Sequence, residues 1–102
     1  CKRAMTDAGY GHVPILLDGG IRSADDILKA VRLGATAVGL GRLILYALAV
    51  DGANGVHHCL EMLRADLRRG MQLLGCESLE QVKKLGMVES FGYHYVPNMN
   101  KL

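Results

Sequence analysis

The stretch Val13-Pro14-Ile15-Leu16-Leu17-Asp18-Gly19-Gly20-Ile21-Arg22 indicates how this chain folds. It opens as an apolar run and passes directly into two glycines and an arginine. An apolar run of this length between turn residues is typical of a buried parallel strand that has both faces covered. A second unit of the same kind follows, in which Ala37-Val38-Gly39-Leu40 leads into Gly41-Arg42. The two units together predict an α/β fold.

A helix is expected between the two strands. Ser23 suits its N-cap, and Asp26 stands at the position of the reciprocal partner in a capping box. Ile27, Ala30 and Val31 recur at a spacing that places them on one inward face. Gly34 suits the end of the helix, because glycine readily adopts the left-handed conformation that closes many helices.

Three further helices are predicted after the second strand. A short apolar one covers residues 42–50, residues 51–55 form a break, and a long one runs over residues 56–74 until Gly75 ends it. A last short helix covers residues 78–84. The long helix is expected to bury a seam of apolar residues at helical spacing, namely Val56, Leu60, Leu63, Leu67, Met71 and Leu74.

The composition is that of one small globular domain. The chain has 102 residues, of which 50% are hydrophobic and 22% charged, and a net charge of +2. That charge gives no reason to expect nucleic-acid or membrane-surface binding, and no apolar run is long enough to span a bilayer. Cys1, Cys59 and Cys76 lack the spacing of metal ligands, so no metal site is expected, and a reducing intracellular setting is the default.

The order strand, helix, strand, followed only by helices, leaves two parallel strands without further neighbours. Parallel sheets are stable when helices cover both faces and more strands join them. The chain also opens without a methionine or a secretory signal. We therefore expect it to be the end of a larger α/β protein, with the last structured residue near 84 and an irregular tail over residues 85–102.

The two glycine–arginine turns are expected to face one ligand. In a strand–helix–strand unit the turns that follow the two strands lie at the same edge, where α/β proteins bind ligands. Gly19 and Gly20 allow the backbone to approach an anion, and amide groups at the start of the following helix favour negative charge. Arg22 and Arg42 can each grip phosphate oxygens. The alternative is a plain tight turn with both arginines solvated, but two such turns favour a phosphate site.

Asp18 and Asp25 are the acidic residues near this predicted site. A carboxylate repels phosphate, so Asp18 is expected to accept hydrogen bonds from turn amides or from a polar group of the ligand. Asp25 adds negative charge close to the phosphate unless its side chain points away.

These motifs resemble the last two βα units of the FMN-dependent 2-hydroxy-acid oxidoreductases, a family that includes glycolate oxidase, lactate oxidase and flavocytochrome-type lactate dehydrogenases. The resemblance covers roughly residues 13–83. It rests on Asp18-Gly19-Gly20-Ile21-Arg22, Leu33-Gly34-Ala35, Val38-Gly39-Leu40-Gly41-Arg42, Leu45-Tyr46-Ala47-Leu48-Ala49, Gly55-Val56, Leu63-Arg64 and residues 71–79, Met71-Gln72-Leu73-Leu74-Gly75-Cys76-Glu77-Ser78-Leu79.

The resemblance implies the C-terminal fragment of a TIM (β/α)8 barrel, with residues 1–84 as that part of the barrel. It implies FMN as cofactor, a 2-hydroxy acid as the substrate oxidised to a 2-oxo acid, and a homo-oligomer for the complete enzyme. The family's catalytic histidine and substrate-gripping arginine belong to the preceding unit, so no catalytic residue is expected in this chain. The FMN-binding positions carried over are Asp18, Gly19, Gly20, Ile21, Arg22, Gly41 and Arg42.

Other interpretations remain open at this point. One is the phosphate-binding segment of a barrel like IMP dehydrogenase or GMP reductase, which carries a similar turn. Another is a truncated half-barrel without catalysis. His12, His57, His58 and His94 are expected to be surface or packing residues. The final Asn100-Lys101-Leu102 is similar to a peroxisomal address and suggests that compartment.

Overall fold

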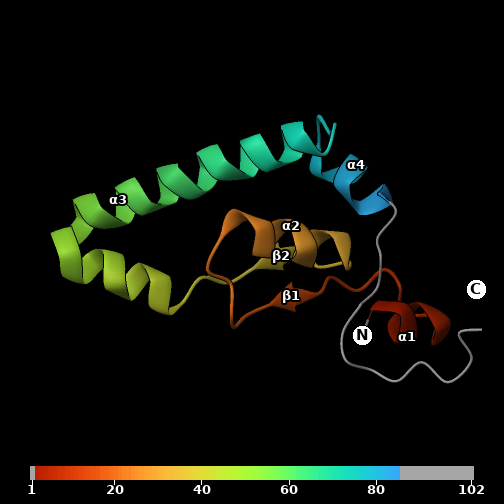
Figure 1. The fold of residues 1–102 in the computed structure, drawn as a ribbon. Coiled ribbons are helices and arrows are strands. Elements are labelled where there is room, and N and C mark those ends of the chain that lie inside the picture. Colours follow the sequence, from red (N-terminus) through yellow and green to blue (C-terminus); the bar gives the residue numbers. More distant parts are fainter. Residues whose placement is uncertain (1, 86–102) are drawn as a thin grey trace, which may run out of the picture.

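A long bent helix arches over a strand–helix–strand unit in the computed structural model, which describes residues 2–85 (Figure 1). Helix α2 lies between this arch and the two strands, and α4 follows at the far end of the long helix. The elements are α1 (Lys2–Asp7), β1 (Leu16–Leu17), α2 (Ala24–Arg32), β2 (Ala37–Val38), α3 (Arg42–Leu73) and α4 (Leu79–Lys84).

The two strands pair in parallel, with Leu16 opposite Ala37 and Leu17 opposite Val38. The N–H of Thr36 donates to the carbonyl oxygen of Ile15 at 2.7 Å, and the N–H of Gly39 donates to that of Leu17 at the same distance. The predicted α/β connection is therefore confirmed.

The strands are shorter than the predicted ranges 13–17 and 37–40. Each has one partner strand among the described residues, and Pro14 has no N–H to offer to a ladder.

The expectation that the first strand is buried on both faces is wrong for the described chain. The side chain of Leu16 is 76% exposed and that of Leu17 is 40% exposed. Helix α2 packs against the strand pair, and no second layer within residues 2–85 covers the opposite face. The exposure of these apolar side chains agrees with the expectation that the chain is a piece of a larger α/β protein.

Helix α2 begins as predicted. The side-chain oxygen of Ser23 accepts from the N–H of Asp26, and the carboxylate of Asp26 accepts from the N–H of Ser23, which completes the capping box. At the other end Gly34 adopts a φ of +104°, so its predicted role in ending the helix is also confirmed.

Helix α3 joins the two helices that were predicted separately. The backbone is non-helical at Asp51 and Gly52, where Gly52 has a φ of +55°. The expected break over residues 51–55 thus shrinks to two residues, because one positive φ at a glycine is enough to redirect the chain. We call residues 42–50 the first arm of α3 and residues 53–73 its second arm. Gly55 lies beside the carbonyl of Ala47, so a Cβ there would overlap that oxygen.

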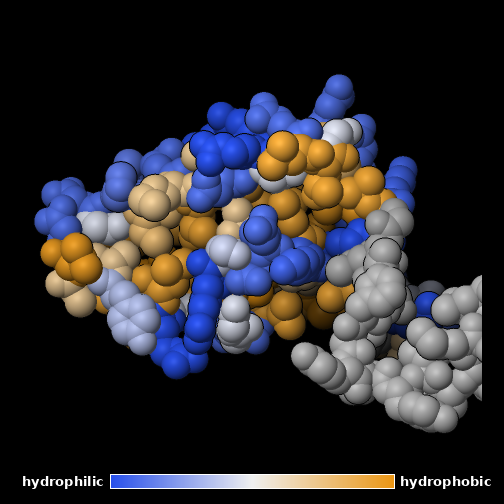
Figure 2. Space-filling model, in the orientation of Figure 1, coloured by the Kyte–Doolittle hydropathy of each residue, from blue (hydrophilic) through white to orange (hydrophobic). Residues whose placement is uncertain are grey.

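The core lies where α2, the second arm of α3 and α4 meet. Gly70 allows the close crossing, since a Cβ there would lie 2.6 Å from Cδ1 of Leu28. Figure 2 shows hydrophilic side chains along the upper edge of α3 and hydrophobic ones below it, toward α2. The buried cluster consists of Leu28, Val31, Cys76 and Val82, with Ile27, Leu67, Met71 and Leu85 packed against it.

The predicted seam of the long helix is only partly correct. Leu67 and Met71 pack against the core, but Leu60 and Leu74 are 44% and 48% exposed. Helix α2 is short and covers one part of the second arm, while Val56 and Leu63 are half-buried.

The two ends of the described chain compare differently with the sequence analysis. Helix α1 was not predicted, whereas the short helix over residues 78–84 is confirmed as α4, with the Ser78 side chain accepting from the N–H of Gln81. The predicted tail begins at Leu85, which packs on the core. Cys1, His94 and Asn100-Lys101-Leu102 lie outside the described residues.

Candidate functional site

A hollow of about 540 Å³ lies at the carboxyl ends of the two strands. The loop after β1 forms one wall, and the start of α3 forms the other. Every residue predicted to bind the phosphate lies on it, so the fold brings the two glycine–arginine turns together. The lining residues are Asp18, Gly19, Gly20, Ile21, Arg22, Gly39, Gly41, Arg42, Leu43 and Tyr46.

The glycine–arginine turn after β1 presents backbone without side chains to the hollow. Gly19 and Gly20 have φ values of +95° and +75°, a region that residues with a Cβ rarely adopt. A Cβ built on either glycine, or on Gly41, meets no atom within 4 Å. These three positions are therefore open toward the hollow, as a backbone that approaches an anion must be.

The carboxylate of Asp18 is held within the turn. Its Oδ1 accepts a hydrogen bond from the N–H of Gly19 at 2.7 Å, which confirms the prediction that this residue accepts from a turn amide. On its other side the carboxylate lies against Gly39, where a Cβ would come within 3.1 Å of Oδ1. The lack of a side chain at Gly39 leaves room for this acidic group at the edge of the hollow.

The guanidinium groups of Arg22 and Arg42 are exposed and lie on the hollow without an acidic partner among residues 2–85. The ion pairs of the described chain are on α3 and α4, between Arg64 and Glu61, Arg69 and Asp66, and Lys83 and Glu80. Two cations that share a concave site, with no carboxylate paired to them in that range, give the site a positive character that favours an anion.

The helix terminus on the hollow is that of α3, not that of α2. At α2 the carboxylate of Asp26 already accepts from the N–H groups of Arg22 and Ser23, at 3.1 and 3.2 Å. The hydrogen bond from Arg22 is the main reason why the pKa of Asp26 is lowered. Ala24 and Asp25, the first residues of α2, do not line the hollow, so the expectation that amides at the start of this helix face the same site is not supported.

Helix α3 begins at the hollow with Gly41 as its N-cap, and no side chain caps it. The N–H of Ile44 turns back to the carbonyl oxygen of Gly41 at 3.0 Å. The first-turn amides of Arg42 and Leu43 have no intrahelical acceptor. This terminus therefore adds a favourable potential for an anion to the charge of the Arg42 side chain.

Three lining residues were not predicted from the sequence: Gly39, Leu43 and Tyr46. For Tyr46 the sequence did offer a signal, the helical spacing that starts at Arg42. Residues three and four positions apart share a helix face, so a helix that begins at the site with Arg42 brings Tyr46 to the same side.

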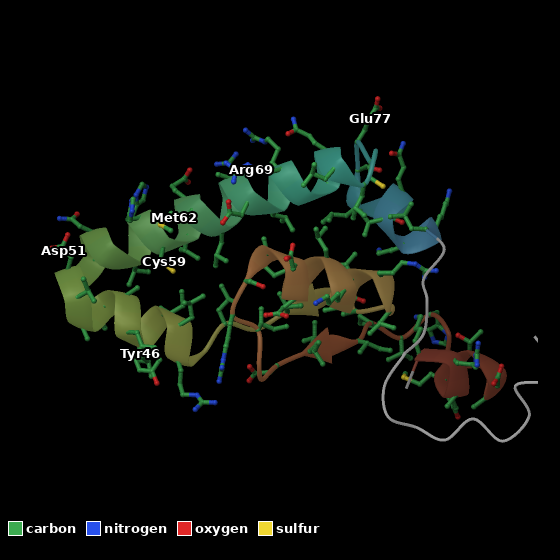
Figure 3. The ribbon with its side chains drawn as sticks, in the orientation of Figure 1. Tyr46, Asp51, Cys59, Met62, Arg69 and Glu77 are labelled. Carbon is green, nitrogen blue, oxygen red and sulfur yellow. The ribbon has the colours of Figure 1, made fainter. Side chains whose placement is uncertain are left out.

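Other polar residues lie away from the hollow. The described histidines His12, His57 and His58 are exposed and do not line the hollow. Asp25, which was expected to add negative charge near the phosphate unless its side chain points away, does not line it either. Figure 3 shows Cys59 pointing toward the space between the arms of α3.

Within residues 2–85 no three side chains of metal-binding type gather closely enough to hold a metal ion, and no helix is long and apolar enough to cross a membrane.

The chain is similar to a well-defined group of proteins. Residues 3–89 match the sequence profile described as FMN-dependent dehydrogenase. Glycolate oxidase 3 of Oryza sativa subsp. indica is 43% identical over 84 residues, which are 82% of this chain and 23% of the relative. The L-lactate oxidase of Alicycliphilus denitrificans is 51% identical over 80 residues, which are 78% of this chain and 21% of the relative. The chain thus spans about a quarter of the length of the relatives it matches.

Solved structures show the same arrangement. A mandelate oxidase determined with benzoyl-formic acid aligns with a TM-score of 0.75 at 42% identity, over 83% of this chain and 25% of that one. A flavocytochrome b2 variant determined with benzoylformate aligns with a TM-score of 0.76 at 38% identity, over 80% of this chain and 21% of that one.

Proposed function

This chain belongs to the FMN-dependent dehydrogenase family, and from that premise we propose that it forms the phosphate-holding part of an FMN-dependent 2-hydroxy-acid oxidoreductase. The observation that carries the proposal is that both glycine–arginine turns line the same hollow. Its donors are Arg22, Arg42 and the amides at the start of α3, and its floor is bare glycine backbone.

The residues present fit the phosphate end of FMN. A phosphate monoester offers several oxygens to the two guanidinium forks, and the open positions at Gly19, Gly20 and Gly41 allow it close to the backbone. Ile21 provides an apolar contact on the wall. Asp18 lies at the same edge, where its carboxylate can accept from a hydroxyl of the ligand but not from the phosphate itself.

The activity of the whole protein is part of the same proposal. Held by Arg22, Arg42 and the glycine turns, FMN would supply a two-electron acceptor for the oxidation of an L-2-hydroxy acid to the 2-oxo acid, and a base would take the hydroxyl proton. The described part of this chain supplies no histidine to the hollow, so the catalytic base is expected elsewhere in a (β/α)8 barrel that residues 1–84 complete. A homo-oligomeric complete enzyme stays a prediction, which sizing of that enzyme would test. A peroxisomal location, suggested by the similarity of Asn100-Lys101-Leu102 to a peroxisomal address, also stays a prediction, which import of a tagged reporter would test.

Titration of the 102-residue chain with flavins tests the proposed function. We expect the chain to bind FMN and to discriminate strongly against riboflavin, which lacks the phosphate that the hollow is built to hold. Flavin fluorescence anisotropy measures both affinities. Equal affinity for the two flavins would refute the proposal. So would a failure to bind FMN both by the chain alone and by the chain mixed with a complementary barrel fragment.

The alternatives predict different results. A segment of a purine-nucleotide barrel would prefer a purine nucleoside monophosphate to FMN in the same titration, and the family match gives that interpretation no support. A non-catalytic half-barrel would bind neither.

A further inference from the structure

Tyr46 lines the hollow and has no assigned role. It projects from the first arm of α3 on the side away from the second arm (Figure 3). Its side chain is not part of the core, since the residue is 64% exposed. Among residues 2–85 its hydroxyl makes no hydrogen bond, so no protein group in that range fixes its direction. A large aromatic residue thus stands at a polar site with a free donor.

The helix sets the relation between Tyr46 and the arginine on the same wall. Arg42 and Tyr46 are four positions apart within the first arm, which is helical from Arg42. Side chains at this spacing lie on one face with their Cβ atoms about 5–6 Å apart. Both residues line the hollow, and Leu43 lies beside them on the same wall. An anion held by Arg42 is therefore within reach of the Tyr46 side chain.

The hydroxyl supplies a kind of donor that the rest of the site lacks. The cationic donors are Arg22 and Arg42, and the first-turn amides of α3 are fixed in direction by the backbone. A phenol hydroxyl rotates and donates one hydrogen bond without adding charge. A hydrogen bond to an ionised acceptor is stronger than one between neutral groups.

We propose that Tyr46 is a third phosphate-binding side chain, whose hydroxyl donates to an oxygen of the phosphate monoester held by Arg22 and Arg42. The inference rests on the proposed function, because it assigns a further residue to the same ligand. The inference concerns how Tyr46 binds the phosphate, and it assigns this residue no part in the reaction.

The test compares Tyr46→Phe with Tyr10→Phe in the 102-residue chain. Both variants lose one exposed tyrosine hydroxyl, and Tyr10 is 60% exposed and does not line the hollow. For Tyr46→Phe we expect FMN to bind about tenfold more weakly, the lower end of the range for a hydrogen bond to a charged group. Inorganic phosphate, measured by displacement of FMN, should weaken by the same factor. Tyr10→Phe should change neither affinity.

The two probes separate the possible roles of the side chain. If the ring merely packs against the organic part of FMN or supports the helix, Tyr46→Phe will leave the phosphate affinity unchanged, and the inference is wrong. Unchanged FMN affinity in Tyr46→Phe also overturns it while leaving the proposed function intact. Failure of the unaltered chain to bind FMN, both alone and mixed with a complementary barrel fragment, overturns both proposals. Because the phenylalanine keeps the ring, we expect its circular dichroism spectrum and melting temperature to match those of the unaltered chain.

Discussion

The replacement Arg42→Gln gives the most direct measure of the proposed anion site. Glutamine keeps much of the length of the side chain and removes its charge and its forked pair of donors. The guanidinium has no acidic partner within residues 2–85, so its removal leaves no carboxylate of that range unpaired. A loss of affinity in this variant can therefore be assigned to the ligand.

The exposure of Arg42 determines the expected size of the effect. A hydrogen bond to a charged group contributes about 1.5 to 3 kcal/mol, and water screens an exposed side chain such as this one toward the lower value. About 1.5 kcal/mol corresponds to a roughly tenfold increase in the Kd for FMN. The assay is flavin fluorescence anisotropy at fixed ionic strength, because a charged contact weakens with added salt.

Arg68→Gln is the matched control. Arg68 is an exposed arginine on the second arm of α3, borders a separate hollow with Glu61 and Arg64, and loses the same unit of charge. We expect it to bind FMN like the unaltered chain. If both variants weaken binding equally, the effect is one of net charge and the assignment of Arg42 to the phosphate is refuted.

The double variant Arg22→Gln, Arg42→Gln asks whether the two arginines hold one phosphate. Residues that share a ligand show coupling of about 0.5 to 3 kcal/mol, whereas independent ones add to within about 0.5 kcal/mol. We expect the effects of the two single replacements not to add. Additive losses would place the arginines on different groups.

Three further predictions concern stability. Ser23→Ala should lower the free energy of unfolding by about 1 kcal/mol in urea titration, because the N-cap hydrogen bond to the N–H of Asp26 is lost. Val82→Ala should cost about 2 kcal/mol by the same measurement, since two methyl groups leave a site that is 1% exposed. The lowered pKa of Asp26 means that its carboxylate stabilises the fold above about pH 3.9 and that this contribution is lost as the pH falls through the lower folded value. Asp26→Asn should make the melting temperature depend less on pH in that acidic range. A pH dependence identical to that of the unaltered chain would contradict this reasoning.

Much of the local structure could be predicted because it depends on neighbouring residues. The capping box of Ser23 and Asp26 and the helix end at Gly34 follow from side-chain chemistry and backbone conformation within a few positions. The juxtaposition of the two arginines could also be predicted, since the handedness and direction of a strand–helix–strand unit leave one arrangement. Both features agree with the structure.

Burial was predicted less well, because it depends on what covers a surface. The apolar sequence of β1 is that of a covered strand, yet Leu16 is 76% exposed where the described chain provides no second layer. Likewise the seam of α3 reaches beyond the part that α2 covers, which leaves Leu60 exposed. Periodicity reports which face of an element is apolar, and it does not report how far its neighbour extends.

From the sequence alone we could predict the parallel α/β unit, the caps of its helix, the glycine turns that leave bare backbone, and the family of the chain. Tertiary packing was needed to show which helix terminus borders the hollow and which residues complete its wall. Asp26 occupies the amides before α2, while α3 starts uncapped at Gly41 and brings Tyr46 to the site. The physical reason is that caps and turns are interactions between near neighbours, whereas a hollow is formed by separate segments whose positions depend on how their helices pack.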